Sequence, residues 1–223
     1  HHYPAATGTC SVDADEVRRA WATRSGAYSP AYYAHHGPDA TSEWVVDAVT
    51  ARLGETATVL EVGCSSGRHL ERFRRVGFDS LAGIEVNPEA LTVMRESFPE
   101  LAAQATFHHG DVEAILTDWE ADAVDVVYAV ETLQHLPATA FDEIARVAGE
   151  LIVTAENEGD ADTSDGVIGE VTRVADGVPL YYRDWGQVFG RRGFSQVAGP
   201  DRVGDRDTGR VLVARDEADA RSE

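Results

Sequence analysis

Lysine is absent from this chain of 223 residues, and there are only two cysteines and one methionine. The two cysteines, Cys10 and Cys64, are too few for a disulfide framework and are not spaced as metal ligands. No stretch of 18 apolar residues is present, so we expect no membrane-spanning helix. The N-terminus also lacks the apolar core of a signal peptide, and we therefore expect a reducing, cytoplasmic location.

Positive charge is scarce. All 19 basic residues are arginines, against 39 acidic residues, and the net charge is −20. A nucleic-acid partner is not expected, because the phosphates need clustered lysine or arginine to displace their counterions. The densest basic cluster, Arg68 to Arg75, is predicted to be a solvated helix face. The acidic, lysine-free composition resembles that of proteins from halophilic organisms, although a bias toward GC-rich codons produces the same pattern.

The most informative segment is the apolar strand predicted at residues 58–62. It runs into a turn made of Gly63, Cys64, Ser65, Ser66 and Gly67. Glycines in such a turn allow a ligand to approach the main chain closely, and the helix that follows presents unpaired backbone N–H groups. Glu61, at the carboxyl end of the strand, favours a ligand with a cationic or hydroxyl-rich group. S-adenosylmethionine carries both kinds of group.

Together, the strand, its acid, the turn and the helix resemble motif I of the class I S-adenosylmethionine-dependent methyltransferases. Ser65 stands where that family usually has a third glycine. The resemblance extends over residues 58–154. It implies that Glu85, at the end of the next strand, accepts hydrogen bonds from the ribose hydroxyls, the task of the strand-end acid in dinucleotide sites. It also implies that Asp111 accepts from the adenine amine, and that the strand at residues 123–129 floors the active site.

Strands alternate with helices along the chain, which predicts a parallel sheet. We expect an α/β fold, a Rossmann-like, doubly wound and mostly parallel seven-stranded sheet with an antiparallel C-terminal hairpin. The strands are predicted at residues 58–62, 80–85, 104–108, 123–129, 150–155, 194–199 and 209–215. The helices are predicted at residues 13–23, 42–53, 66–76, 88–97, 112–117, 138–148 and 184–192, with a tyrosine-rich turn at 28–38.

One domain is expected over residues 1–223, with His1 and His2 interpreted as the remnant of an affinity tag. Residues 1–53 are predicted to form a helical lid, and residues 58–154 the cofactor-binding core. The glycine- and aspartate-rich segment at 156–183, with a short hairpin at 167–178, is predicted to be a substrate loop. Residues 184–215 supply the last helix and the hairpin.

The candidate cofactor residues stand mostly at strand ends, although ordinary turns favour the same residue types. Val86 and Val112 each follow a key acid and are expected to sandwich the adenine, while Arg24 is expected to reach the methionine carboxylate. The predicted cofactor-binding residues are Glu61, Gly63, Cys64, Ser65, Gly67, Glu85, Val86, Asp111, Val112, Val130 and Arg24.

His135, after the fourth strand of the core, is the candidate general base, because an imidazole titrates near neutral pH. Packing against a helix start explains the same residue equally well, and many methyltransferases need only proximity and alignment. No metal site is expected, because the acids are scattered and the paired histidines lack a third ligand. The predicted substrate residues are Tyr28, Tyr32, Tyr33, Glu131, Tyr181 and Tyr182.

The predicted function is methyl transfer from S-adenosylmethionine to an oxygen or nitrogen of a small molecule, by a monomer or a homodimer. A non-catalytic module that binds the cofactor is the main alternative. Residues 63–67 match the Gly-x-Ser-x-Gly elbow of a serine hydrolase. That class needs an acid and then a histidine after the serine, normally near the end of the sheet. It is disfavoured because the last histidine here is His135, with 88 residues still to follow. The glycines also lack the spacing of a dinucleotide-dependent oxidoreductase.

Overall fold

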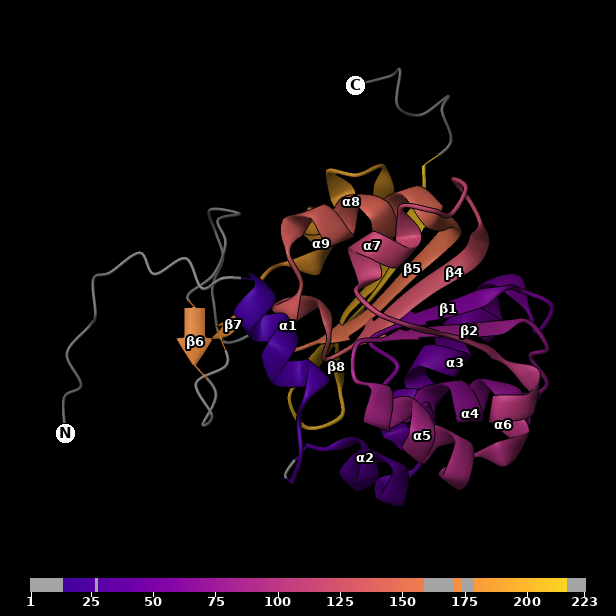
Figure 1. The fold of residues 1–223 in the computed structure, drawn as a ribbon. Coiled ribbons are helices and arrows are strands. Elements are labelled where there is room, and N and C mark those ends of the chain that lie inside the picture. The colour runs from indigo at the N-terminus through magenta and orange to yellow at the C-terminus, as the bar shows by residue number, and fades with distance from the viewer. Residues whose placement is uncertain (1–13, 27, 159–170, 174–178, 216–223) are drawn as a thin grey trace.

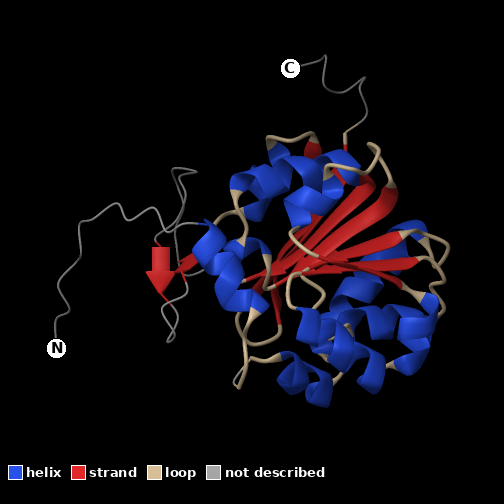
Figure 2. Ribbon diagram, in the orientation of Figure 1, coloured by secondary structure: helices blue, strands red, loops and turns tan. Residues whose placement is uncertain are grey.

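The computed structural model describes residues 14–26, 28–158, 171–173 and 179–215. Its centre is a seven-stranded sheet in the order β3-β2-β1-β4-β5-β9-β8 (Figures 1 and 2). The first five strands are parallel, whereas β9 and β8 are antiparallel, so the predicted fold class is confirmed. The strands are β1 (Val59–Val62), β2 (Leu81–Glu85), β3 (Thr106–His109), β4 (Val124–Val130), β5 (Ala148–Glu156), β8 (Phe194–Val203) and β9 (Asp207–Ala214).

Helices cover both faces of this sheet (Figure 1). The helices on one face are α3 (Ala40–Leu53), α4 (Arg68–Val76), α5 (Pro88–Ser97) and α6 (Pro99–Gln104). Those on the other face are α7 (Val112–Leu116), α8 (Ala138–Val147) and α9 (Trp185–Gly190). In β1, Val59 belongs to the first core and Leu60 to the second, because successive side chains of a strand point to opposite faces. The two cores hold the strand ends in a fixed arrangement.

The tyrosine-rich segment is a helix, so its prediction as a turn is wrong. α2 (Pro30–His36) is capped at its N-terminus by Ser29, whose side chain accepts a hydrogen bond from the backbone N–H of Tyr32. A proline fits the first turn of a helix, where its missing N–H would have no partner in any case. α2 packs beside α5. The preceding helix, α1 (Ala14–Ala22), lies close to its predicted bounds.

Two further differences lie in the second half of the cofactor-binding core. Pro99 starts the unpredicted α6, which displaces the start of β3 from the predicted residue 104 to Thr106. A short 3-10 turn, η1 (Leu133–His135), follows β4. Both are short elements with little periodic signal of their own.

The segment between β5 and α9 is described only in part. β6 (Val171–Arg173) pairs with β7 (Pro179–Tyr181), and most of the hairpin predicted at 167–178 lies outside the described residues. β7 lies beside η1. Within the described ranges, no helix has the length and hydrophobicity that crossing a bilayer requires.

Candidate functional site

The carboxyl ends of β1, β2 and β4 meet at one edge of the sheet and surround a pocket. Ligands of open α/β sheets bind at this edge, where the strand order changes direction. In the sheet order, β2 and β3 lie on one side of β1, and β4 and β5 on the other. α1 adds Val17, Arg18 and Trp21 to the pocket wall. The position of the pocket is therefore set by the topology of the sheet, and its cover by the N-terminal helix.

Gly63 is the tightest point of the pocket wall. Its φ angle is +72°, and the backbone N–H groups of Gly63 and Cys64 both donate to the Ile84 carbonyl, at 2.9 and 3.0 Å. A Cβ atom at this position would lie 2.3 Å from Oγ1 of Thr132. Glycine is therefore required here both by the backbone conformation and by the close approach of the loop after β4.

Glu85 holds the turn from the neighbouring strand. One carboxylate oxygen accepts from the backbone N–H of Ser65 at 2.8 Å, and the other accepts from Asn87, also at 2.8 Å. Burial raises the pKa of Glu85, although these backbone bonds oppose the shift. A carboxylate has about four lone-pair sites, so Glu85 keeps capacity for a further donor, such as a hydroxyl of a diol.

Glu61 is buried at the end of β1. It is 1% exposed, and the hydroxyl of Tyr128, its partner across β1 and β4, donates to its Oε2 at 2.8 Å. Burial raises the pKa of Glu61 well above its usual value. Burial likewise raises the pKa of the Cys64 thiol, so Cys64 is a small neutral side chain of the turn. Glu61 therefore makes a buried contact between β1 and β4 and does not line the pocket.

Asp111 is paired with the lid helix α1. Nε of Arg18 lies 2.6 Å from Oδ1 of Asp111, and Nη2 of Arg18 lies 2.5 Å from Oε1 of Glu113. Both carboxylates belong to the start of α7, whereas Arg18 is near the N-terminus. This pair of contacts closes α1 over the end of the pocket that the sequence assigns to the adenine.

A contact between two aromatic rings connects α1 to the loop after β4. The ring of Trp21 lies 4.6 Å from that of His135, at an interplanar angle of 55°. The guanidinium of Arg24 lies over the rings of Trp21 and Tyr28, at 4.9 and 5.6 Å from their centroids. His135 lines the pocket and also packs against Trp21, so both of its sequence interpretations, base and packing residue, remain compatible with its position.

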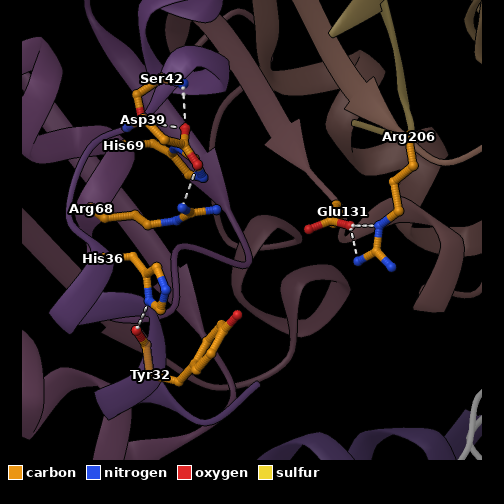
Figure 3. Close-up of polar contacts among 8 residues, drawn as sticks. All are labelled: Tyr32, His36, Asp39, Ser42, Arg68, His69, Glu131 and Arg206. Atoms are coloured by element: carbon orange, nitrogen blue, oxygen red, sulfur yellow. Dashed lines mark hydrogen bonds and ion pairs between the residues drawn. The ribbon is translucent and has the colours of Figure 1, made fainter. Parts of the chain in front are cut away.

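Arg68 does not lie on a solvated face, because its side chain is 13% exposed, whereas that of Arg75 in the same predicted cluster is 51% exposed. The guanidinium of Arg68 lies 2.5 Å from Oδ2 of Asp39 and over the ring of Tyr33, as the close-up in Figure 3 shows for the ion pair. Asp39 also accepts from Ser42, whose hydroxyl is 2.7 Å from Nδ1 of His69. Burial and the nearby charge of Arg68 lower the pKa of His69 to about 3. Both Arg68 and the neutral His69 line the pocket.

Glu131 also lines the pocket, and in Figure 3 it lies across the view from Arg68. Its φ angle is +49°, and its Oε1 lies 2.5 Å from Nη2 of Arg206, in the turn between β8 and β9. Tyr33 faces the same region, and burial together with the charge of Glu131 raises its pKa to about 12. This side of the pocket is therefore lined by an acid, whose cationic partner Arg206 lies outside the lining, and by a neutral phenol.

Most residues predicted for the site do line one pocket. Those that line it are Arg24, Tyr28, Tyr33, Gly63, Cys64, Ser65, Glu85, Val86, Asp111, Val112, Val130, Glu131 and His135. Gly67 faces the core, where a Cβ would lie 2.9 Å from Leu101. Tyr32 is 43% exposed beside Tyr33, and Tyr182 does not line the pocket. The side chain of Tyr181 is outside the described residues.

Sequence reasoning missed several residues that shape the pocket. Asn87 had a local signal, because asparagine before proline and glutamate is typical of a helix start. Arg18, Arg68 and Thr132 had none, since their positions follow from contacts between distant segments. Sequence periodicity predicts their elements but not their partners.

The residues present fit S-adenosylmethionine. Glu85 retains acceptor capacity beside a turn that a side chain at position 63 would fill, and Val86 and Val112 supply apolar walls near Asp111. In the described part of the chain, no three histidine, cysteine, aspartate or glutamate side chains are grouped as a metal site requires.

Comparison with known proteins agrees with this geometry. Residues 59–150 match a family model described as "Methyltransferase domain". A dTDP-3-amino-3,4,6-trideoxy-alpha-D-glucopyranose N,N-dimethyltransferase of Streptomyces venezuelae is 35% identical over 36% of this chain and 33% of its own length. A dTDP-4-amino-2,3,4,6-tetradeoxy-D-glucose N,N-dimethyltransferase of Saccharopolyspora spinosa is 33% identical over 43% of this chain and 40% of its own. The chain thus spans well under half the length of these relatives.

Solved structures share the fold over most of the chain. Magnesium protoporphyrin IX methyltransferase from Synechocystis PCC 6803, with bound SAH, has a TM-score of 0.62 at 17% identity, covering 92% of this chain and 100% of the other. A 1,6-didemethyltoxoflavin-N1-methyltransferase from Burkholderia thailandensis has a TM-score of 0.63 at 16% identity, covering 79% of each chain. At these identities the likeness establishes the fold alone.

Proposed function

We propose that the protein, whose residues 59–150 match a methyltransferase-domain model, transfers a methyl group from S-adenosylmethionine to a nitrogen of a small molecule. The observation that carries the proposal is the meeting of the Gly63 turn, Glu85 and the loop after β4 around a single pocket. S-adenosylmethionine is the cofactor of such domains. When bound, it supplies an electrophilic methyl group on its sulfonium.

The cofactor end of the pocket holds its ligand through fixed acceptors. Glu85 offers its remaining lone pairs to the ribose hydroxyls, because Ser65 and Asn87 already fix its orientation. Asp111 would accept from the adenine amine, and Val86 and Val112, which line the same part of the pocket, would supply apolar walls for the base. The Gly63 turn brings the backbone close to the remainder of the ligand.

The acceptor end orients a nucleophile. Glu131 and Tyr33 offer hydrogen bonds to an amine or hydroxyl, and the aromatic rings of Tyr28 and Trp21 offer apolar surfaces. A neutral amine would use its lone pair for the new C–N bond while the methyl–sulfur bond breaks and S-adenosylhomocysteine leaves. The methylated amine then releases a proton, which His135 is placed to take. Proximity and alignment within the pocket supply the rest.

Nitrogen is favoured over oxygen because both curated relatives are named as N,N-dimethyltransferases of amino sugars. Amino sugars, free or attached to a nucleoside diphosphate, are therefore the first acceptors to screen, and hydroxylated molecules the second. A module that only binds the cofactor is the alternative. A hydrolase is disfavoured further, because His69, the histidine nearest in sequence to the turn, bonds Ser42 and not Ser65.

Calorimetric titration with S-adenosylmethionine and S-adenosylhomocysteine tests the proposal. We expect micromolar or tighter binding in the wild type, and a loss of about 10- to 100-fold in Glu85→Gln, which removes one charged acceptor. Glu89→Gln, an exposed glutamate of α5, is the matched control and should bind as the wild type does. Folded wild-type protein that binds neither ligand would refute the proposal, and binding without turnover of any amine would favour the non-catalytic module.

The same titration, run in molar and in low salt, tests the halophilic origin that we infer from the composition. Surface carboxylates of a halophilic protein repel one another in low salt, so folding and binding should both weaken there. Cytoplasmic location, a monomeric or homodimeric state, and the division into lid, core, substrate loop and C-terminal hairpin stay predictions.

A further inference from the structure

We propose that Glu156 is a positioning residue, which fixes the acceptor side of the pocket by anchoring the loop of residues 131–135 through its backbone. The proposal rests on the proposed function, because this loop carries Glu131 and His135 into the pocket. Glu156 itself does not line the pocket. It acts through the residues between these two.

Glu156 ends β5 at a fully buried position, beside the start of the loop. Its Oε1 accepts two hydrogen bonds, from the backbone N–H of Thr132 at 2.9 Å and from that of Leu133 at 3.0 Å. The backbone N–H of Glu131 donates to the carbonyl of the adjacent Ala155. Three consecutive N–H groups of the loop are therefore held by the last two residues of one strand.

The anchored residue Thr132 also contacts the cofactor end. Its hydroxyl donates to the Val130 carbonyl at 3.0 Å and lies against Gly63, where a Cβ atom would approach within 2.3 Å. A displacement of Thr132 would therefore move the wall that both ligands share. In this way a single buried carboxyl sets the distance between the cofactor turn and the acceptor loop.

The second oxygen of Glu156 gives the anchor its pH dependence. Oε2 is buried and has no hydrogen-bond partner among the described residues. Leaving a charged oxygen buried and unpaired is costly, so a proton on Oε2 favours the conformation in which Glu156 anchors the loop of residues 131–135. Burial, assisted by the charges of Asp207 and Glu131, raises the pKa of Glu156 to about 8, whereas the bonds from Leu133 and Thr132 lower it.

The charges around Glu156 are mostly of its own sign. Asp207, at the start of β9, is 6% exposed, and its Oδ1 also lacks a hydrogen-bond partner among the described residues. Burial and then Glu131 raise the pKa of Asp207 to about 7, against the opposing charges of Arg206 and Arg202. Ionisation of Glu156 above pH 8 thus adds a charge next to two acids, and the loop should open more often.

Hydrogen exchange of residues 131–136 tests this proposal without any methyl acceptor. The protein is compared in molar salt from pH 6 to pH 9, with exchange corrected for its intrinsic pH dependence. We expect the wild type to lose protection of these amides by about tenfold or more above pH 8. Glu156→Gln keeps the accepting oxygen and carries no proton to lose, so its protection should stay constant with pH.

Glu156→Ala should lose the protection at every pH, whereas Thr154→Val is the matched control. Thr154 lies two residues earlier in β5, equally buried, with a hydroxyl that no described residue bonds, so this variant alters the strand without touching the anchor. If Glu156→Ala does not fold, the pH comparison of wild type and Glu156→Gln still decides the question.

Protection that rises with pH in the wild type, or that falls equally in Glu156→Gln, would overturn the proposal. Affinity for S-adenosylmethionine, measured on the same samples, separates this outcome from a failure of the proposed function. A folded protein whose loop behaves as expected but which binds no cofactor would retain the anchor and lose the methyltransferase assignment.

Discussion

The two ends of the pocket are built in different ways. At the cofactor end, the acid at the tip of β2 is held by backbone N–H groups of Ser65 and Asn87, in the turns that immediately follow β1 and β2. At the acceptor end, Glu131 pairs with Arg206, 75 positions further along the chain, and Trp21 packs on His135. The first arrangement follows from strand-end turns, whereas the second exists only when distant segments meet.

This difference predicts a difference in sensitivity. Where turns build the site, one substitution that changes the backbone conformation should cause a large loss of ligand affinity. Where side-chain pairs build it, the loss of one pair should cause a smaller decrease in affinity. The two ends meet at one point, where Gly63 touches Thr132. A substitution there should affect both ends at once.

Gly63→Ala should therefore have the largest effect of the changes considered. A left-handed conformation costs an alanine about 1–2 kcal/mol, and the collision with Thr132 adds to that cost. We expect affinity for S-adenosylmethionine to fall by more than about 100-fold, together with increased hydrogen exchange of residues 131–136. Calorimetry and exchange measurements check both effects.

Gly54→Ala is the control for Gly63→Ala. Gly54 has a φ angle of +74°, nearly that of Gly63, and nothing lies within 4 Å of a Cβ built there. With a ψ angle of −174°, Gly54 lies in a region that is essentially open to glycine alone, so the variant should lose stability of about 1–3 kcal/mol from the backbone and keep its affinity for the cofactor. Equal losses of affinity in the two variants would mean that general destabilisation, and not the contact with Thr132, causes the effect.

The cofactor end was largely predictable from the sequence. The turn after β1, the acid Glu85 and the segment at Asp111 each combine a strand with a local signal of glycine or acid, and all three line the pocket. Even here, Glu61 and Gly67 face the interior. The direction of Glu61 depends on its partner strand, and that of Gly67 on the packing of neighbouring helices, and the motif contains neither.

The acceptor end was predictable only as a set of residue types. Tyr33 and Glu131 were expected near the substrate, but nothing local indicates that Arg206 reaches Glu131 or that Glu156 anchors Thr132. Tyr32 illustrates the limit: the same helix that brings Tyr33 to the pocket turns Tyr32 outward, and the sequence had predicted a turn there. Such contacts follow from tertiary packing, which carries no short-range pattern.

A second prediction sharpens the comparison through the stability of the acceptor end. The folded-state pKa of Glu156 is raised to about 8, whereas an unfolded glutamate titrates near pH 4.3. Between about pH 4 and 8 the folded protein holds a proton that the unfolded chain releases, so the contribution of Glu156 to the free energy of unfolding falls as pH rises. It is complete below about pH 4 and lost above about pH 8.

Glu156→Gln lacks this proton, and its free energy of unfolding should lack this part of the pH dependence. Relative to the variant, the wild type should lose up to about 1.4 kcal/mol for each pH unit that lies fully within the window. Chemical denaturation at pH 5 to 9 in molar salt measures the difference. Thr154→Val, which has no titratable group, should run parallel to the wild type, and a parallel curve for Glu156→Gln would contradict the prediction.

The smallest expected effect is at the lid helix α1. Its ion pairs join segments that are distant in the sequence, as the pair of Glu131 and Arg206 does at the acceptor end. Arg18 bridges Asp111 and Glu113, and its side chain is 30% exposed, so solvent screens the pair and its worth is about 1 kcal/mol or less. Arg18→Ala should weaken binding of S-adenosylmethionine by about three- to fivefold, through faster dissociation, and less in high salt. Stopped-flow displacement by S-adenosylhomocysteine measures the rate, with Arg19→Ala, an exposed arginine of the same helix, as the control. Tighter binding of S-adenosylmethionine in Arg18→Ala would contradict this interpretation. Arg18 would then compete with the adenine for Asp111, and its ion pair would be stronger in the free protein than in the complex.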